Sequence, residues 1–441
     1  MKKVVLVGGG PAGLFAARKL IDHGFDVILI EKSSNVGGSG LIIDGKFNYH
    51  PRIGGDLTEF LTEEEAWKIV DDVQAIFKEY GAEEGAYNYD KLKKLEEKAI
   101  RAGINFIPIK QSHVGSDLLP SIILRFKDDL ERRGVKIRLN CSAEDIKIKD
   151  GKVTEVITNK GNIECDFVLL APGRSGESWI KRLCEEHGLE IKFNPIDVGV
   201  RVEVRNEIMN EIVEDYKCWD PKFHIYTSES DDFVRTFCVC PGGYVTKDFY
   251  GDDLVGVNGH SLSKIGKPSE NTNFAFLVRI AFTEPVEDTT EYGKAIVHQA
   301  NILGGKKPLI QRLGDLKNHR RSYWDRIAKS YVKPTLYKNE NGEFEVTPGD
   351  ISMALPERVM AGITEGLEKL DKVIPGVYSD STLLYAPEVK FYARRVITNR
   401  FLQTLRITNL YVAGDGAGVS RGIVGAATTG IIAANGIINS R

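Results

Sequence analysis

A run of glycines between an apolar strand and a helix constrains the fold of this chain more than any other feature. Four apolar residues, Val4–Val7, are followed at once by GGGPAG, Gly8–Gly13. Gly8 permits a tight turn out of the strand, Gly10 lets the backbone approach a pyrophosphate without a Cβ in the way, and Gly13 lets the helix pack closely on the sheet. The order of strand, glycines and helix predicts a Rossmann-like βαβ unit that binds a dinucleotide.

An acidic residue completes this unit. A second apolar run, Val27–Ile30, ends at Glu31, which follows Gly8 at close to the spacing of roughly 20 residues at which an acid bonds the ribose hydroxyls. Unpaired N–H groups at the start of the helix, and the positive end of its dipole, favour an anion there. We therefore expect the cofactor to be bound by Gly8, Gly10, Pro11, Ala12, Gly13, Glu31 and Lys32.

The far end of the chain decides between NAD and FAD. Asn409–Ile437 reads as a strand, a glycine-rich turn that contains Asp415, and a helix of small residues. This segment resembles the second flavin motif of the FAD superfamily that includes the glutathione-reductase-like and p-hydroxybenzoate-hydroxylase-like proteins. The resemblance implies that the aspartate bonds the ribityl or pyrophosphate region and that the helix N-terminus points at flavin N1 and O2. It adds as cofactor-binding residues Gly414, Asp415, Gly422, Ile423 and Val424.

A third segment of the same superfamily lies in mid-chain. Lys136–Gly176 resembles the adenine-side strand, the β-meander and the short A-x-G flavin contact. It adds as cofactor-binding residues Ser142, Ala143, Ala171, Pro172 and Gly173. Three segments in this order imply FAD held without a covalent link. They also imply an α/β fold, a Rossmann-like three-layer ββα FAD-binding fold with an inserted mixed α/β substrate lobe.

A closer resemblance extends over nearly the whole chain. The chain is similar to an uncharacterised FAD-dependent dehydrogenase family of bacteria and archaea, which implies an FAD-dependent oxidoreductase. The first matching segment, Gly37–Gly55, adds Gly38, Ser39 and Gly40 to the expected cofactor site. The other matching segments are APGRSG at Ala171–Gly176, DVGVRVEV at Asp197–Val204, RTFCVCPGGYV at Arg235–Val245, PEVKFYARR at Pro387–Arg395 and GDGAGVSRGI at Gly414–Ile423.

The domains are expected to be discontinuous. We predict an FAD domain built from residues 1–35, 112–176 and 407–441, a helical insertion near the cofactor at 36–111, and a substrate or cap lobe at 189–404. Helical patterns fall at Thr62–Tyr80, Asn88–Ala102 and Asp117–Gly134, the last capped by Ser116 or Asp117. The charged segment Leu316–Arg326 is expected to be a solvated helix face, with a binding role as the alternative.

Composition excludes several classes of protein. The formal net charge of −3 over 441 residues gives no electrostatic basis for nucleic-acid binding. We found no apolar run near the roughly 20 residues that span a bilayer, and we expect a cytoplasmic protein. The six cysteines show no zinc-ligand spacing, so no metal site is predicted. Cys238 and Cys240 do not match C-x-x-C, and they are either packing residues or neighbours of the flavin or substrate.

The catalytic residues are harder to choose. We consider five residues, Lys46, Arg201, Cys240, Lys390 and Arg421. Lys46 is close in sequence to Asn48 and Arg52, and Lys390 is close to Glu388. The cationic side chains of this set could bind a carboxylate substrate or form structural ion pairs. Arg421 could stabilise negative charge on a reduced flavin or make a phosphate or surface contact. His50, His113 and His260 could donate protons, and no general base is named.

Flavin carries its own chemistry, so the function follows from the cofactor more than from a catalytic triad. We expect a dehydrogenase or reductase that transfers a hydride or electrons between flavin N5 and a small organic substrate. A flavin monooxygenase and a non-catalytic binding or escort protein are the alternatives. Because a single GxGxxG follows a strand, NAD(P)H is expected only as a transient electron donor, with a redox protein as the other candidate donor.

Overall fold

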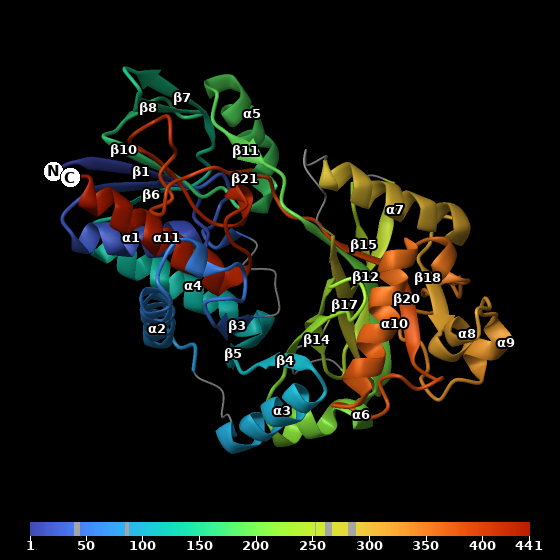
Figure 1. Ribbon diagram of the computed structural model, residues 1–441. Helices are drawn as coiled ribbons and strands as arrows, with labels where there is room; N and C mark the ends of the chain where they lie inside the picture. Colours follow the sequence, from blue (N-terminus) through green and yellow to red (C-terminus); the bar gives the residue numbers. More distant parts are fainter. Residues whose placement is uncertain (39–44, 84–87, 252, 261–266, 281–287) are drawn as a thin grey trace. The chain divides into compact units, whose positions relative to one another are not determined.

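The structure is a computed structural model that describes residues 1–38, 45–83, 88–251, 253–260, 267–280 and 288–441, with the side chains of residues 113 and 115–117 outside the description. The chain forms two compact units (Figure 1). Unit 1 contains Met1–Gly85, Lys110–Asn194 and Tyr392–Arg441, and unit 2 contains Ala86–Ile109 and Pro195–Phe391. Each unit is described by itself.

A five-stranded parallel sheet forms the centre of unit 1, in the order β22-β10-β1-β2-β6. The two apolar runs of the predicted βαβ unit are its strands β1 and β2, which pair from Lys3 and Asp26 to Val7 and Ile30. Four consecutive residues at the end of each strand are buried, because both faces of a parallel sheet are covered. The strands are β1 (Lys3–Val7), β2 (Asp26–Ile30), β6 (Lys136–Arg138), β10 (Phe167–Leu170) and β22 (Leu410–Val412).

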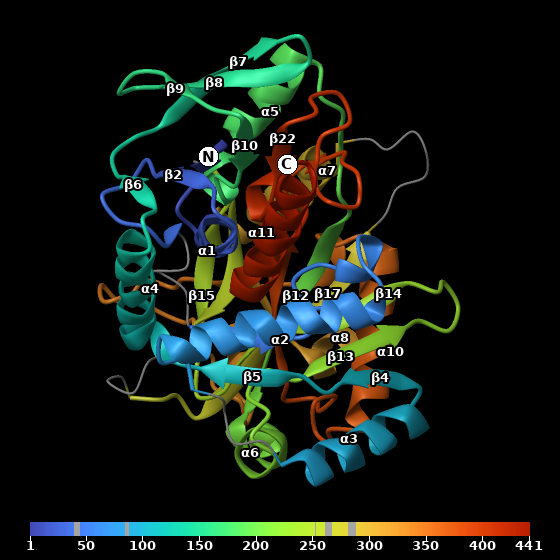
Figure 2. The same ribbon diagram turned by 90° about the vertical axis from the view of Figure 1, so that its left-hand side faces the viewer.

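Two further layers cover this sheet (Figures 1 and 2). An antiparallel meander lies on one face, formed by β7 (Ala143–Lys149), β8 (Lys152–Thr158) and β9 (Ile163–Glu164). Three helices lie on the other face, α1 (Pro11–Asp22), α4 (Gly115–Arg132) and α11 (Gly422–Asn439). The order of meander, parallel sheet and helices confirms the predicted three-layer ββα fold.

Helices α1 and α11 pack with their backbones in close contact. A Cβ on Gly430 of α11 would lie 2.1 Å from the carbonyl oxygen of Ala12 in α1. Among the described residues, α11 is the helix whose length and mean hydropathy, 1.3 over 18 residues, would suit a bilayer, which our reading of the sequence did not anticipate. Because 78% of it is buried inside the protein, the apolar composition is that of a core helix.

Two of the predicted helices differ in how their starts match the expected caps. Helix α2 (Glu63–Glu79) begins after Thr62, whose side chain accepts from the backbone N–H of Glu65 while the Glu65 carboxylate accepts from the Thr62 N–H. This capping box confirms the predicted helix. The predicted caps of α4, Ser116 and Asp117, are wrong, because the helix begins at Gly115 and Val114 is its N-cap. Unit 1 also contains β3 (Lys46–Tyr49), β5 (Lys110–His113), α5 (Glu177–His187), β11 (Ile191–Lys192) and β21 (Arg395–Val396).

Unit 2 is built on an eight-stranded, mainly antiparallel sheet, in the order β19-β18-β20-β12-β17-β14-β13-β4. Its strands are β4 (Ile104–Ile107), β12 (Ile196–Arg205), β13 (Lys222–Tyr226), β14 (Phe233–Cys240), β17 (Asn271–Ile280), β18 (Leu309–Arg312), β19 (Thr347–Pro348) and β20 (Leu383–Lys390). A hairpin, β15 (Tyr244–Phe249) and β16 (Val255–His260), is paired separately. The helices are α3 (Tyr89–Arg101), α6 (Asn206–Asn210), α7 (Thr289–Gly304), α8 (Leu313–Lys317), α9 (Trp324–Ala328) and α10 (Glu357–Asp371).

Both faces of strand β12 are buried. The valines at positions 198, 200, 202 and 204 join the core that contains the apolar residues of α7 and α10. The alternate positions are polar, yet Asp197, Arg201 and Glu203 are each 0% exposed. A Cβ on Gly259 in β16 would lie 1.7 Å from the Arg201 guanidinium, so the β15–β16 hairpin covers the polar face. The sequence VGVRVEV therefore describes a strand with a buried ionic face.

Two expectations about domain boundaries differ from the structure. Residues 36–111 do not form one insertion, because β4 pairs with β13 and takes α3 into unit 2. The expected substrate lobe, 189–404, is longer than the continuous part of unit 2, since residues 189–194 and 392–404 belong to unit 1.

The prediction of one solvated helix at Leu316–Arg326 is wrong. Helix α8 ends at Lys317, α9 begins at Trp324, and the buried carboxylate of Asp315 accepts from Arg320 at 2.9 Å and Arg326 at 3.2 Å.

Candidate cofactor site

The glycine turn between β1 and α1 is shaped by close backbone contacts. Gly8 has a φ of 107°, and a Cβ there would lie 2.1 Å from the carbonyl oxygen of Ala171. A Cβ on Gly13 would lie 2.0 Å from the carbonyl oxygen of Gly8. Gly10, the N-cap of α1, differs, because no atom of the described residues, apart from its neighbours along the chain, lies within 4 Å of its Cβ position. Gly8 and Gly13 are thus required by the fold itself, and Gly10 leaves space in front of the helix N-terminus.

Glu31 stands at the end of β2 and holds this turn. Its Oε2 accepts from the backbone N–H of Gly9 at 2.8 Å, and its Oε1 accepts from the N–H of Ser33 at 2.8 Å. The residue is 6% exposed. Because each carboxylate oxygen can accept more than one hydrogen bond, the acid keeps the capacity to bind a ribose hydroxyl.

The predicted adenine-side residues lie beside Glu31. The backbone N–H of Cys141 donates to the carbonyl oxygen of Glu31 at 2.8 Å, and β7 begins two residues later at Ala143. The N–H of Ser142 donates to Asn159 Oδ1 at 3.0 Å. The side chain of Lys32 donates to Ser175 Oγ at 2.9 Å. The structure thus brings the end of β2 and the start of the meander together.

The segment after Gly37 also reaches the glycine turn. The N–H of Gly37 donates to the carbonyl oxygen of Gly9 at 2.7 Å, and a Cβ on Gly38 would lie 4.0 Å from the Cα of Gly10. Gly38 is therefore placed next to Gly10, as its expected role requires. Two further predicted cofactor residues, Ser39 and Gly40, lie outside the described residues.

The A-x-G segment and the C-terminal glycine turn meet at the ends of β10 and β22. A Cβ on Gly416 would lie 2.1 Å from the carbonyl oxygen of Gly173. Arg174 donates from Nε and Nη2 to Asp415 Oδ2 at 3.1 and 3.0 Å. Our reading of the sequence missed Arg174, although it follows a predicted contact residue directly. Asp415 is therefore held by a cation from the mid-chain segment.

The start of α11 carries a cation with an unused donor. Arg421 is the N-cap of the helix, as the expected start near Arg421 to Val424 required. Its N–H donates to the carbonyl oxygen of Gly54 at 2.7 Å, and its guanidinium lies 4.3 Å from the ring centroid of Tyr392. Within the described part of unit 1, Arg421 Nη1 is buried without a hydrogen-bond partner. A cation and a helix N-terminus together suit negative charge on a bound group.

Comparison with known families identifies the cofactor. Residues 195–391 match the family model described as FAD-dependent protein, C-terminal domain-like. Residues 6–44, which contain the glycine turn and Glu31, match the NAD(P)-binding Rossmann-like domain. FAD is the cofactor of this chain. The open space at Gly10 and the unpartnered Arg421 Nη1 fit a bound dinucleotide of this kind.

Individual relatives give a broader view. An uncharacterized protein of Clostridium beijerinckii is 28% identical over 466 residues, which covers 98% of this chain and 80% of that protein. Thiamine thiazole synthase of Pyrobaculum calidifontis is 36% identical over 107 residues, 24% of this chain and 36% of the synthase. Among solved structures, glycine oxidase from Bacillus cereus is 15% identical with a TM-score of 0.42, and the match covers 100% of this chain and 96% of the oxidase.

Three residues considered as catalytic candidates lie in a buried cluster of unit 2. Arg201 Nη1 pairs with Glu388 Oε1 at 3.3 Å, and Lys390 Nζ pairs with the same oxygen at 2.8 Å. Arg201 also donates to Cys240 Sγ at 3.3 Å. Arg201 and Glu388 are 0% exposed and Lys390 is 7% exposed. Of the two roles considered for these cations, the structure favours the ion pair, because a carboxylate ligand could reach them only by displacing Glu388.

Another buried carboxylate lies on the same face of the sheet. Glu203 accepts from the hydroxyls of Thr335 and Tyr385, both at 2.5 Å. Burial raises the pKa of Glu203 above its ordinary value, and it raises the pKa of Tyr385 as well. Hydrogen bonds from two hydroxyls compensate for the lost hydration of this side chain.

The remaining polar candidates of unit 1 gather on and after β3. Asn48 Oδ1 accepts from Gln111 at 2.9 Å, and Lys46 pairs along the backbone with His113. Arg52 lies 3.8 Å from Glu63. Burial, followed by the charge of Arg52, lowers the pKa of His50 to about 4. His50 is therefore neutral at pH 7, and the cationic ring that could act as a proton donor forms only in acid. In unit 2, His260 is exposed at the end of β16.

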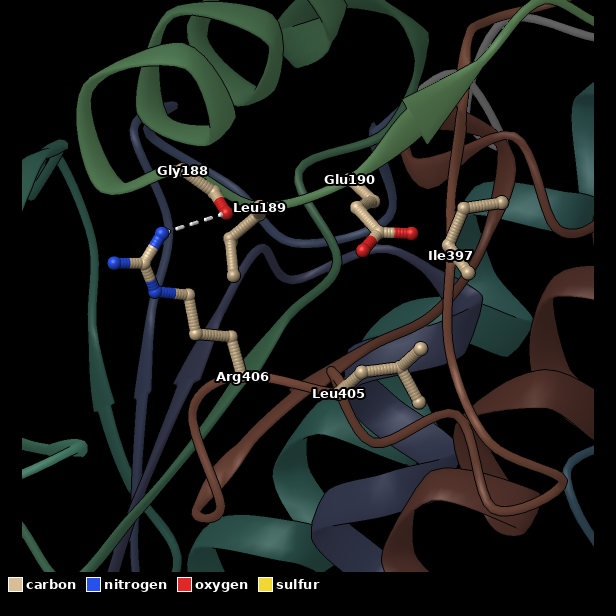
Figure 3. Close-up of a pocket in the computed structure, with 6 residues that line it drawn as sticks. All are labelled: Gly188, Leu189, Glu190, Ile397, Leu405 and Arg406. Carbon is tan, nitrogen blue, oxygen red and sulfur yellow. Dashed lines mark hydrogen bonds between the residues drawn. The ribbon is translucent and has the colours of Figure 1, made fainter.

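A surface pocket of about 280 Å³ in unit 1 lies apart from every predicted site residue (Figure 3). It is lined by Gly188, Leu189, Glu190, Ile397, Leu405 and Arg406. Arg406 Nη1 donates to the Gly188 carbonyl oxygen at 3.3 Å across its edge. Among the described residues, a group of metal-ligating types also occurs at Asp145, Glu186 and His187, where a 2.9 Å hydrogen bond joins the first and last of the three.

Proposed function

We propose that this protein is an FAD-dependent dehydrogenase or reductase that acts on a small organic substrate. Bound FAD would supply the hydride or electron chemistry at N5 and would be held without a covalent link. The observation that carries the proposal is the meeting, within unit 1, of the glycine turn, the A-x-G segment and the Asp415 turn. A complete cradle of this kind has little use in a protein without redox chemistry.

The residues of the cradle have separate tasks in this proposal. The N–H groups at the start of α1 bind the pyrophosphate, and Glu31 bonds the adenosine ribose. Asp415 accepts from the ribityl or pyrophosphate region while Arg174 fixes its orientation. The start of α11, with Arg421, would stabilise negative charge on a bound cofactor.

Electron donor and partners belong to the proposal as well. Because a single GxGxxG follows a strand in the sequence, NAD(P)H is proposed to bind transiently, and a redox protein is the other proposed donor. We propose a cytoplasmic location and no nucleic-acid partner, in line with the net charge of −3. A flavin monooxygenase and a non-catalytic escort protein remain the competing functions.

Three measurements on purified protein separate these functions. Heat or acid should release one FAD per chain, and a colourless protein that does not bind added FAD would overturn the proposal. Anaerobic titration with NADH, NADPH and a reduced ferredoxin should bleach the flavin with at least one donor. After reoxidation by oxygen, hydrogen peroxide should appear at once and in an amount equal to the FAD, whereas delayed release would favour a monooxygenase. A stable protein complex without turnover would favour an escort role.

A further inference from the structure

Two cysteines of unit 2 lie at an irregularity in strand β14. The pairing of β14 with β17 shifts between Phe237 and Cys240, so one extra residue is accommodated on β14. Cys238 lies within this bulge and has a φ of 48°, which a residue other than glycine seldom adopts. The sulfur atoms of Cys238 and Cys240 are 3.9 Å apart. A disulfide, with its bond of about 2.05 Å, therefore requires only a small movement of the two side chains.

A buried guanidinium contacts both cysteines. Arg201 Nη2 donates to Cys240 Sγ at 3.3 Å and to the carbonyl oxygen of Cys238 at 2.7 Å. Two buried cations, Arg201 and Lys390, share the carboxylate of Glu388. Positive charge next to sulfur stabilises the thiolate, which is the reactive form of cysteine. The bulge therefore places two close sulfurs beside a buried guanidinium.

The two thiols differ in access from solvent. Cys240 is 0% exposed, whereas Cys238 is only partly buried. An incoming reagent can thus reach Cys238 but not Cys240. In three other cysteines burial disfavours the thiolate, since it raises the pKa of Cys165 to about 12, of Cys184 to about 11 and of Cys218 to about 12.

We propose that Cys238 and Cys240 form a reversible dithiol–disulfide site that exchanges with low-molecular-weight disulfides and thiols. The Cys238 thiolate attacks one sulfur of the small disulfide, whose S–S bond breaks, and one thiolate leaves and takes a proton from water. Cys240 then attacks Cys238 Sγ in the mixed disulfide and releases the second small thiol. Two protein thiols lose two electrons, and the small disulfide gains them. Exchange with a reducing thiol reverses the reaction.

This site is independent of the proposed oxidoreductase function, because it requires no substrate of the flavin. The spacing of the two cysteines also explains why the pair would react reversibly. A disulfide between residues two apart closes a small, strained ring, and strained disulfides are the more easily reduced ones. The site is expected to respond to the ratio of small thiol to small disulfide.

The test uses the FAD-loaded protein and a series of glutathione redox buffers. After acid quenching and alkylation, trypsin yields the peptide Thr236–Lys247, which contains Cys238 and Cys240 and no other cysteine. With increasing oxidised glutathione, this peptide should lose two hydrogen masses and become resistant to alkylation, and reduced glutathione should restore it. A peptide that stays in the dithiol form in excess oxidised glutathione, or that ends as a persistent mixed disulfide, would overturn the proposal.

Matched variants assign the two roles. Cys240→Ser should accumulate glutathione on Cys238, because no second thiol resolves the mixed disulfide. Cys238→Ser should take up at least tenfold less glutathione, since Cys240 is buried. Cys184→Ser should behave as the wild type. Equal labelling of the two serine variants would contradict the assignment, and the wild-type peptide decides the question if either variant fails to fold.

Discussion

The carboxylate of Glu31 accepts a hydrogen bond from the backbone N–H of Gly9 at 2.8 Å. This bond joins the end of the second strand to the turn that follows the first. The acid expected at the ribose therefore also fixes the loop that approaches the pyrophosphate. Its other oxygen accepts from the N–H of Ser33, so one buried side chain orders both segments that we expect to face the adenosine half of FAD.

Replacing Glu31 should weaken FAD binding more than the loss of a ribose contact alone. Glu31→Ala leaves the N–H groups of Gly9 and Ser33 without their acceptor, and each unsatisfied buried donor costs about 1–3 kcal/mol. We expect the Kd for FAD, measured by quenching of flavin fluorescence, to rise at least tenfold. Glu185→Ala, an exposed carboxylate of α5, is the control and should change the Kd less than threefold. An unchanged Kd in Glu31→Ala would show that neither interaction contributes.

Substitutions at two glycines of the same turn should have different effects, one on FAD binding and the other on stability. Gly10→Val adds a side chain where, among the described residues, only the neighbours of Gly10 along the chain lie within 4 Å of the Cβ position, and the φ of −76° suits valine. The variant should fold, with an unchanged circular dichroism spectrum, but should purify without FAD.

Gly8→Ala places a Cβ 2.1 Å from the carbonyl oxygen of Ala171 at a φ of 107°. Backbone strain alone costs about 1–3 kcal/mol, so the melting temperature of the apoprotein should fall. Recovery of yellow Gly10→Val protein would contradict the assignment of Gly10 to the pyrophosphate.

The sequence predicts the cradle well because its constraints are local. A strand, a glycine turn and a helix follow one another within a few residues, and the same is true of Asp415 and α11. The ion pair between Arg174 and Asp415 joins residues 241 positions apart, so no local pattern reveals it. The strands, turns and helices of the cradle could be predicted, whereas the side chain that pairs with Asp415 could not.

In unit 2, the sequence alone does not reveal which strand faces are buried or which elements pack together. Alternation of valine with polar residues in β12 predicts one face in the core and one in water. The β15–β16 hairpin covers the second face, so Arg201 and Glu203 are buried, and only tertiary structure reveals this. In the same way, the pairing of β4 with β13 decides that α3 belongs to unit 2, although the helix itself was predicted from its periodicity.

The pair formed by Arg174 and Asp415 should show coupling in FAD binding. Asp415→Ala removes the expected cofactor contact and should raise the Kd for FAD at least tenfold. Arg174→Ala should raise it less than about fivefold, because exposed ion pairs contribute roughly 0–1 kcal/mol. The double variant should match Asp415→Ala, since Arg174 acts through Asp415. Additive losses would instead indicate that Arg174 contacts the cofactor directly.

Removing the shared carboxylate of the buried cluster should destabilise the protein strongly. Glu388→Gln leaves Arg201 without its carboxylate partner and leaves Lys390 with only Asp248, at 4.0 Å. Breaking a buried ion pair in this way costs about 3–5 kcal/mol. The free energy of unfolding in urea should fall by this amount. Glu270→Gln breaks the exposed pair with Arg205 and should cost less than about 1 kcal/mol. A small effect of Glu388→Gln would mean that water or another carboxylate compensates.

Because the pKa of His50 is lowered in the folded protein, the free energy of unfolding should decrease in acid. The ring is neutral in the folded protein down to a pH of about 4, while the unfolded chain binds a proton near pH 6.5. The unfolded state therefore binds more protons between these values, and the free energy of unfolding should decrease as pH falls through this window. Because the ring is partly exposed, we expect a loss of about 1–2 kcal/mol, less than the full shift would give.

The measurement compares urea unfolding of the wild type and His50→Gln at saturating FAD from pH 7 to pH 4. Groups other than His50 titrate equally in both proteins, so the difference between the two curves isolates this histidine. The wild type should lose stability relative to the variant as pH falls. His298→Gln, which changes an exposed histidine of α7, should stay parallel to the wild type. A parallel curve for His50→Gln as well would show that the ring takes up its proton equally in the folded and unfolded states.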